Sequence, residues 1–317
     1  TRSAWRSTIL RCRCPISTCS KGCADRVARA HWLALLACVA SSGCARSAPP
    51  SRFPDAASLL ARLHEQQSCS RGLSGEGKLD YFGKEGRIRG SVLFMTSSPD
   101  SVRLDVVSPF GATISTLTSN GRDFSLYDLR QKVFLVGPAN ACNLGRFTHV
   151  PMPPHALVSL LRGEAPLLTH TAPEATLAWE GGQYVVRIAS KHQATQEIAI
   201  SPADADYDKP FGQQRVSRSI FEDRQQNYVL YRAELEQHDP AVTAPPRSDP
   251  DGIDPDVPPS GPECRAALPR RLHIAVPAEE QDLVLSISEI AHNPPLKAGS
   301  FQQVPPSGVV VRSSPCQ

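Results

Sequence analysis

Two short segments of this sequence place residue types at spacings that could carry chemistry. In the first, residues 72–79 read GLSGEGKL, which approaches the phosphate-binding pattern GxxxxGK[ST] but places Leu79 where a hydroxyl would meet magnesium. That loop must also join a buried strand to a helix, whereas these residues follow a helical pattern and lead into a strand pattern. Nucleotide binding is therefore not expected.

The second segment is acidic. Residues 249–256 read DPDGIDPD, and their alternating carboxylates could supply hard oxygen ligands to calcium. Ile253 occupies the third ligand position of an EF-hand, and no glutamate follows at the twelfth. The segment lies within residues 239–263, whose Pro, Asp and Ser content is typical of a solvated, disordered loop. No calcium site is expected here.

Patterns of catalytic residues are missing from the sequence. It contains neither a GxSxG elbow nor an HExxH helix, and its nine histidines lack metal-ligand spacing. Cys12, Cys14, Cys19 and Cys23 lack the paired CxxC arms or histidine partners of common zinc sites. We therefore predict no catalytic residue, no metal and no cofactor, and we expect a binding role rather than an enzyme.

Cys44 closes an apolar run that begins at His31 and reads HWLALLACVASSGC. With Arg26 and Arg29 upstream and roughly ten apolar residues, the run is too short to span a membrane and is typical of a signal peptide. It resembles the bacterial lipoprotein signal, in which the cysteine is lipid-modified and becomes the new N-terminus. Ser41 stands where such signals usually carry leucine, so ordinary secretion is the alternative, and a buried cysteine after an apolar helix is another.

We interpret residues 1–44 as the signal peptide. Residues 1–26 hold many arginines and four cysteines, and no methionine precedes Met95, so this part is interpreted as an over-extended start. After Cys44 the sequence ARSAPPSR, residues 45–52, is small and proline-containing, which is typical of a tether.

Composition and charge limit the number of domains and the kinds of partner that the chain after Cys44 can have. About 270 residues follow Cys44, enough for one large all-β domain or two small ones. The 34 Lys and Arg residues nearly balance 31 Asp and Glu residues, which argues against a nucleic-acid partner. Four further cysteines form an even set that indicates two disulfides in an oxidising envelope, with three possible pairings, and free buried thiols are the alternative. They are Cys69, Cys142, Cys264 and Cys316.

Hydrophobic periodicity predicts a helix and then a sheet. Asp55 suits a first helical turn, and Ala56, Leu59, Leu60 and Leu63 follow on one helical face. From residue 75 to 137 the apolar period is two, which predicts a meander of antiparallel strands. A proline-rich break and a short helix at 155–162 interrupt the pattern. Further strands are predicted at 175–180, 183–189, 197–201, 228–235, 271–276 and 283–290. The predicted fold class is mainly β (α+β), a half-open antiparallel β-barrel with covering helices.

Residues 108–126 read SPFGATISTLTSNGRDFSL, with a P-apolar-G turn after a strand, and residues 150–166 read VPMPPHALVSLLRGEAP, with a P-x-P segment that opens a helix. In this order the two segments resemble the LolB/LolA-like family, in which LolB is an outer-membrane lipoprotein that receives other lipoproteins from the periplasmic carrier LolA. The resemblance covers residues 53–305. The chain departs from the family in residues 201–265, in the four extra cysteines and in the proline-rich tail from Pro294.

The resemblance implies one domain at 53–305, with a disordered insertion at about 239–263 and a tail at 306–317. It implies a cavity for the acyl chains of lipid-modified lipoproteins. Each methylene that is buried there contributes about 0.8 kcal/mol to the binding free energy of the chain. We expect a monomer, anchored through Cys44 at the periplasmic face of the outer membrane, with lipoproteins, a LolA-like periplasmic carrier and outer-membrane lipid as partners. The expected cavity residues, whose alternative is a filled core, are Leu79, Val92, Phe94, Leu104, Val106, Ile114 and Phe124.

Phe110 occupies the apolar position of the P-apolar-G turn. In the family this position is an exposed leucine that inserts into the membrane, so the resemblance implies the same role for Phe110; a turn residue that folds back onto the sheet is the alternative.

The expected function is to bind acyl chains and help insert them into the membrane. A non-catalytic envelope scaffold and an unrecognised hydrolase are the alternatives. An open cavity would favour the first, a solid core the scaffold, and a nucleophile with a base in a cleft the hydrolase.

Overall fold

The computed structural model describes residues 46–84, 86–226, 228–248, 250–252, 256–314 and 316. The chain divides into two units, Thr1–Arg46 and Ser47–Gln317, and the second unit holds all the elements described below. The predicted signal peptide and its Cys44 lie outside the described residues.

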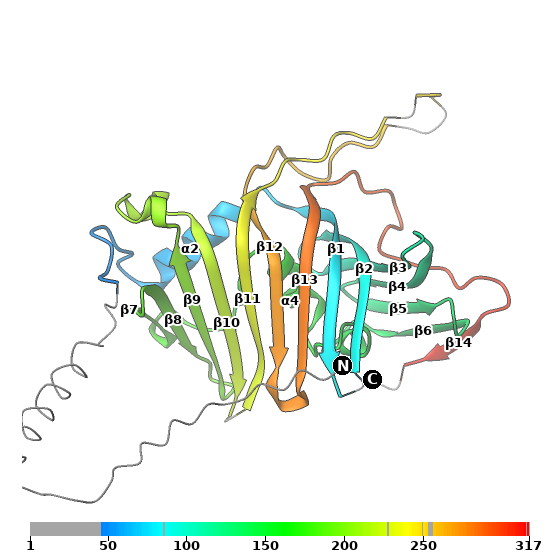
Figure 1. The fold of residues 1–317 in the computed structure, drawn as a ribbon, viewed down its shortest axis with the longest axis horizontal. Helices are drawn as coiled ribbons and strands as arrows, with labels where there is room; N and C mark the ends of the chain where they lie inside the picture. The colour runs from blue at the N-terminus through cyan, green and yellow to red at the C-terminus, as the bar shows by residue number, and fades with distance from the viewer. Residues whose placement is uncertain are drawn as a thin grey trace, which may run out of the picture. The chain divides into compact units, whose positions relative to one another are not determined.

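The described strands form one sheet (Figure 1). Neighbouring strands are antiparallel, except that β14 pairs with β6 in parallel. The order is β14-β6-β5-β4-β3-β2-β1-β13-β12-β11-β10-β9-β8-β7, with different strands at its two edges, so the sheet is open. The predicted class, mainly β with an unclosed antiparallel sheet, is confirmed. The strands are β1 (Gly72–Gly83), β2 (Gly86–Ser97), β3 (Ser101–Val107), β4 (Thr113–Asn120), β5 (Asp123–Asp128), β6 (Val133–Pro138), β7 (Ala175–Glu180), β8 (Gln183–Ala189), β9 (Ala194–Pro202), β10 (Val216–Gln225), β11 (Tyr228–Pro240), β12 (Ala267–Val276), β13 (Gln281–His292) and β14 (Val310–Ser313).

Helices cover one face of this sheet, behind the strands in Figure 1. Helix α2 (Ala56–Gln67) begins at Asp55, whose carboxylate accepts a 2.7 Å hydrogen bond from the amide of Ser58 and so caps the helix. It contacts β7, while α4 (Pro154–Leu161) contacts β3 and β12. The apolar faces of both helices are therefore buried against the sheet. The described residues also form four 3₁₀ turns: η1 (Ala172–Glu174), η2 (Asp204–Asp206), η3 (Phe211–Gln213) and η4 (Pro277–Glu279).

Helix α3 (Ala141–Thr148) was not predicted from the sequence. Its eight residues are too few to show a clear apolar period, and helices this short depend on tertiary packing. Asn140 caps it by accepting a 2.9 Å hydrogen bond from the amide of Asn143, and Leu144 is fully buried. Helix α3 therefore exists because of contacts that are distant in sequence.

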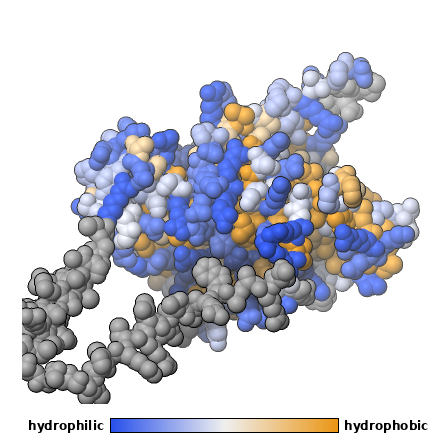
Figure 2. All heavy atoms as spheres, in the orientation of Figure 1, coloured by the Kyte–Doolittle hydropathy of each residue, from blue (hydrophilic) through white to orange (hydrophobic). Residues whose placement is uncertain are grey.

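The opposite face of the sheet carries the polar side chains of the same strands. In the view of Figure 2, hydrophilic residues dominate over β9–β11, and hydrophobic residues are more frequent over the half that holds β1–β6. Leu93, on β2, is one of the exposed apolar residues, and it pairs in register with Glu76 and Asp105. Val92, its neighbour, is buried on the helix-covered face. The alternation along β2 thus separates the two faces residue by residue.

The glycine-rich segment that approaches a phosphate loop is part of β1. Its residues pair with β2 on one side, and from Leu73 onward they pair with β13 on the other, with a register shift between Glu76 and Gly77. A Cβ atom on Gly75 would lie 2.5 Å from the Phe94 ring, so this glycine lets the ring pack flat against the strand. The glycines of this segment are explained by strand packing, and the segment opens no helix.

Two disulfides join distant parts of the chain. Cys69, after α2, is bonded to Cys264, before β12, and Cys142 in α3 is bonded to Cys316 in the tail. The structure therefore selects one of the three pairings that the sequence leaves open. Each bond closes a loop of well over a hundred residues, which in the chain-entropy account stabilises the fold by about 2–5 kcal/mol.

The described residues between β11 and β12 include a projecting arm whose base is paired to the sheet (Figure 1). Thr243 bridges to His292 at the end of β13, and its hydroxyl accepts a 2.7 Å hydrogen bond from the amide of Cys264. Farther out, Arg247 and Val257 exchange two backbone hydrogen bonds of 3.1 and 3.0 Å. Part of the acidic motif, Asp249 and residues 253–255, lies outside the described residues. The prediction of a disordered insertion stays a prediction.

The described part of the predicted tether contacts the domain. The amide of Phe211 donates a 3.0 Å hydrogen bond to the Ser51 hydroxyl, and the Gln214 side chain donates a 3.1 Å hydrogen bond to the Ser51 carbonyl. Pro49 is buried. Residues 47–51 are therefore held against the loop between β9 and β10.

Candidate functional site

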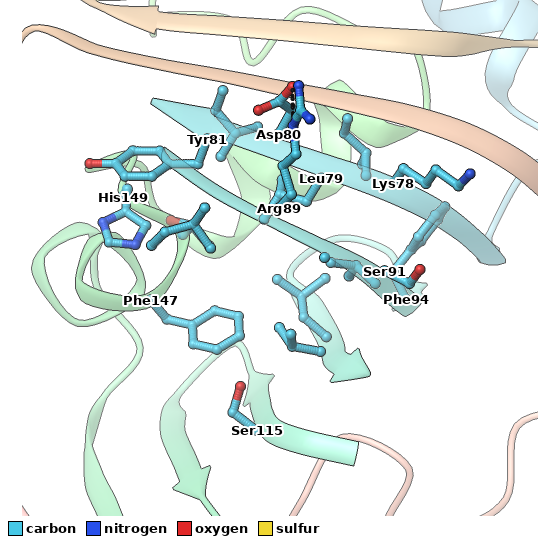
Figure 3. Close-up of a pocket in the computed structure, with 18 of the residues that line it drawn as sticks. Lys78, Leu79, Asp80, Tyr81, Arg89, Ser91, Phe94, Ser115, Phe147 and His149 are labelled. Atoms are coloured by element: carbon cyan, nitrogen blue, oxygen red, sulfur yellow. Dashed lines mark hydrogen bonds and ion pairs between the residues drawn. The ribbon is translucent and has the colours of Figure 1, made fainter. Parts of the chain in front are cut away.

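An open cavity of about 1190 Å³ lies between the sheet and the segment that joins α3 to α4. Strands β1–β5, β12 and β13 supply one wall, and residues 146–161 supply the other. Its volume exceeds the roughly 300–1,000 Å³ of ordinary small-molecule pockets. Figure 3 shows residues that line it. The fold therefore leaves a large space where a filled core would otherwise stand.

Six of the seven cavity residues expected from the sequence line this space. They are Leu79, Val92, Phe94, Leu104, Val106 and Ile114. Phe124, the seventh, is a buried core residue and does not line the cavity. It lies on β5 two residues before Leu126, which does line it. Two residues along a strand keep the face but move the side chain by about 7 Å, so Phe124 is on the correct face and beyond the end of the cavity.

The remaining apolar lining was not identified from the sequence. On the covering wall it includes Phe147, Met152, Leu157 and Leu161. On the sheet it includes Leu272 and Ile274 of β12 and Leu283 and Leu285 of β13. The alternation of those two strands was visible in the sequence, but their place in the sheet was not. Strand β13 lies beside β1 and β12 follows it, and the β1–β13 pairing joins Glu76 to Glu289 across more than two hundred residues.

One end of the cavity is deep and the other is open. Phe94 and Leu161, at the deep end, are 3 % and 2 % exposed. Ile88 and Pro109 also line the cavity, and both are exposed. They lie at the end of the sheet that carries the β1–β2 and β3–β4 turns. The mouth of the cavity is therefore at this end.

Phe110 projects from the β3–β4 turn beside the mouth. Its side chain is 96 % exposed, so the ring does not fold back onto the sheet. The Gly111 amide donates a 2.9 Å hydrogen bond to the Ser108 carbonyl, and the Ala112 amide donates a 3.1 Å bond to the Ser108 hydroxyl. Gly111 has a φ of +80°, a conformation that favours glycine. The turn thus holds Phe110 at its tip, next to Pro109.

Two stacked rings hold the covering wall near the mouth. Tyr81 of β1 and His149, which follows α3, lie with ring centroids 4.1 Å apart and planes 20° apart (Figure 3). Tyr81 is buried, and His149 has a left-handed φ of 59° that ends α3. A Cβ atom on Gly83 would lie within 2.7 Å of the Tyr81 ring, so Gly83 leaves room for this tyrosine. The stack places Phe147 on the cavity wall.

Charged residues border the cavity in two sets. Lys78, Asp80, Arg89 and Arg271 alternate along their strands with inward residues such as Leu79 and Leu272, so their side chains lie on the opposite face of the sheet. Arg130, Arg146 and Asp128 stand at the mouth. Asp80 accepts hydrogen bonds of 2.7 and 2.5 Å from Arg87, and these bonds hold the pKa of the Asp80 carboxyl down at about 2. Asp128 accepts the backbone amides of Arg130 and Gln131. At the mouth, two arginines therefore stand with one carboxylate, and the walls behind them are mostly apolar.

A hydrolase would need a nucleophile in contact with a base in the cavity. A serine–histidine contact exists elsewhere, where the Ser70 hydroxyl lies 2.9 Å from Nδ1 of His292. Both residues are fully buried, neither lines the cavity, and Nε2 of His292 lies 3.0 Å from the Ala266 carbonyl. In the described part of the chain, no cluster of three or more His, Cys, Asp or Glu side chains could hold a metal ion. None of the described helices combines the length and apolar character needed to cross a membrane.

Comparisons with known proteins were made for the sequence and for the fold. No protein-family model matches the sequence, and no curated protein matches it. Among solved structures, a DUF1329 family protein from Desulfovibrio piger is similar at a TM-score of 0.47 and 10% identity, covering 77% of this chain and 95% of that chain. A LolA superfamily protein from Nitrosomonas europaea is similar at a TM-score of 0.42 and 9% identity, covering 79% of this chain and 99% of that chain. We therefore base the function on the geometry of the cavity.

Proposed function

We propose that this protein is a lipid-binding lipoprotein of the outer membrane that holds acyl chains in its cavity and helps insert them into the bilayer. The clients are lipid-modified lipoproteins or other lipids, delivered by a LolA-like periplasmic carrier. The protein is anchored through Cys44 at the periplasmic face and acts as a monomer without enzymatic chemistry.

The open apolar cavity carries this proposal. A chain of sixteen carbons holds fourteen methylenes, and at about 0.8 kcal/mol each their burial is worth roughly 11 kcal/mol before the costs of binding. Leu79, Leu104 and Leu285 present side chains of the type that such burial requires. A scaffold that binds protein through the same sheet would have no use for this space.

The mouth of the cavity supports the membrane step. Phe110 is the most exposed large apolar residue among those that the structure describes, and it stands beside Pro109 of the lining. An apolar side chain held at a turn tip gains free energy by entering the acyl boundary of a bilayer. A chain leaving the cavity at this end would then pass directly into the membrane.

Two neighbouring residues of β2 provide a matched test. Val92 faces the cavity, whereas Leu93 is exposed on the opposite face. In the full chain, Val92→Trp places an indole in the cavity, and Leu93→Trp places the same indole in solvent. Calorimetric titration with oleate should show binding to the wild type and to Leu93→Trp, and at least tenfold weaker binding to Val92→Trp. Absence of oleate binding to the folded wild type would overturn the proposal.

A further inference from the structure

Two arginines and one aspartate stand at the cavity mouth: Arg130, Arg146 and Asp128. The Asp128 carboxylate is engaged by backbone amides. Within the described residues, the guanidinium groups of Arg130 and Arg146 have no ion pair, although both line the cavity.

These two arginines stand on opposite walls. Arg130 belongs to the turn between β5 and β6, at the same end of the sheet as the Phe110 turn. Arg146 lies in the last turn of α3, three residues before the histidine that stacks on Tyr81. Both side chains are exposed, whereas the interior beyond them is apolar. A ligand that fills the cavity and reaches its mouth would therefore meet Arg130 on the sheet side and Arg146 on the covering side.

We infer that the cavity takes a lipid with an anionic phosphate or carboxylate head, which Arg130 and Arg146 bind at the mouth while the chain lies against the apolar walls. This inference rests on the proposed function and names the class of lipid. A guanidinium group binds a carboxylate or phosphate with two parallel hydrogen bonds, and it does so more strongly beside an apolar surface than in open water. Among the clients of the proposed function, this inference selects lipids with a charged head over lipoprotein anchors, whose diacylglyceryl group is uncharged.

Two lipids with the same acyl chain and different heads distinguish binding of the head group from binding of the chain. Oleate carries a carboxylate, and glyceryl monooleate carries a neutral head on the same eighteen-carbon acyl group. Each is titrated, below its aggregation concentration, into the full chain and into the double variant Arg130→Gln/Arg146→Gln. The control is Arg122→Gln, because Arg122 is an exposed arginine in the β4–β5 turn at the other end of the sheet. Inorganic phosphate is titrated separately.

The double variant should bind oleate about fivefold more weakly than the wild type, which corresponds to two partly exposed ion pairs. Its affinity for glyceryl monooleate should be unchanged, and Arg122→Gln should match the wild type for both lipids. Raising NaCl from about 50 mM to about 500 mM should weaken oleate binding to the wild type and have little effect on the double variant.

Each contrary result has a distinct meaning. Equal oleate affinity in the wild type and the double variant would overturn the head-group inference and leave the acyl cavity standing. Binding of inorganic phosphate at the concentrations that saturate oleate would assign the arginines to a free anion and also overturn the lipid inference. Failure of both lipids to bind the folded wild type would overturn the proposed function itself.

Discussion

Tyr81 and His149 are stacked at 4.1 Å between ring centroids, and this contact joins the sheet to the segment that covers the cavity. It links β1 to the end of a helix that has no clear signal in the sequence. Because the covering segment also supplies Phe147 and Met152 to the lining, the stack fixes the shape of the cavity near its mouth.

Loss of this stack should loosen the covering wall. His149→Asn keeps a residue that tolerates the left-handed backbone but removes the ring. A ring pair contributes about 0.5–1.5 kcal/mol, so the melting temperature should fall by about 1–6 °C. Thermal unfolding followed by circular dichroism measures the change. An unaltered melting temperature together with unaltered oleate affinity would show that the stack has no such role.

Substitution of Phe110 should affect membrane delivery without affecting the fold. The side chain is 96 % exposed, so Phe110→Glu should change the free energy of unfolding by less than about 0.5 kcal/mol. Transfer of a lipid-modified client to liposomes should become several-fold slower, because a charged side chain does not enter the acyl boundary. The control, Phe110→Trp, should retain transfer. Unchanged transfer by correctly folded Phe110→Glu would reject the membrane role of this residue.

Acidification should destabilise the domain through His292. Burial lowers the pKa of this imidazole, and Arg162 lowers it further. The unfolded chain then binds more protons than the folded one, so the contribution is fully present above about pH 6.5 and is lost as the pH falls through the histidine range. Burial of Glu164 and Asp223 raises the pKa of each carboxyl, which contributes in the opposite direction. The test must therefore compare a variant with the wild type.

In that test the free energy of unfolding is measured in urea at about pH 7.5 and about pH 5.5. His292→Gln should show a smaller loss between the two pH values than the wild type, by up to about 1 kcal/mol, since the carboxylates act equally in both proteins. An identical loss would mean that His292 does not titrate differently in the folded chain.

Removal of the Cys142–Cys316 bond should release the C-terminal strand. β14 is a short edge strand whose described side chains are exposed. Its other attachments include hydrogen bonds of Asn143 with the Cys316 carbonyl and the Ser314 hydroxyl. In Cys142→Ser/Cys316→Ser, amide exchange should accelerate in β14 and β6, with little change in β8. Unchanged protection in β14 would show that pairing with β6 is sufficient to hold it.

The sequence predicts the elements of this fold better than their arrangement. Local patterns identified the helix after Asp55 and the alternation that places Leu79, Val92 and Ile114 on one face. Alternation fixes a face and not a position along it, which is why Phe124 was included although it lies beyond the cavity. The exposure of Phe110 could be anticipated only from the resemblance of its turn, because turn residues often fold back.

Other parts of the site depend on contacts that no local pattern contains. The pairing of β1 with β13 brings Leu283 and Leu285 to the wall from far along the chain. Arg130 and Arg146 are ordinary surface residues in the sequence, and they become a pair only where the two walls of the cavity meet. The choice of disulfide partners likewise followed from the fold.

The central claim is that acyl chains lie in this cavity, and photo-crosslinking tests it most directly. A fatty acid with a diazirine at the end of its chain is bound to the full protein, illuminated and mapped by mass spectrometry. The account predicts adducts at the deep end, on residues such as Phe94, Leu104 and Leu161. Adducts confined to the opposite face around Leu93, or the absence of specific adducts, would contradict it.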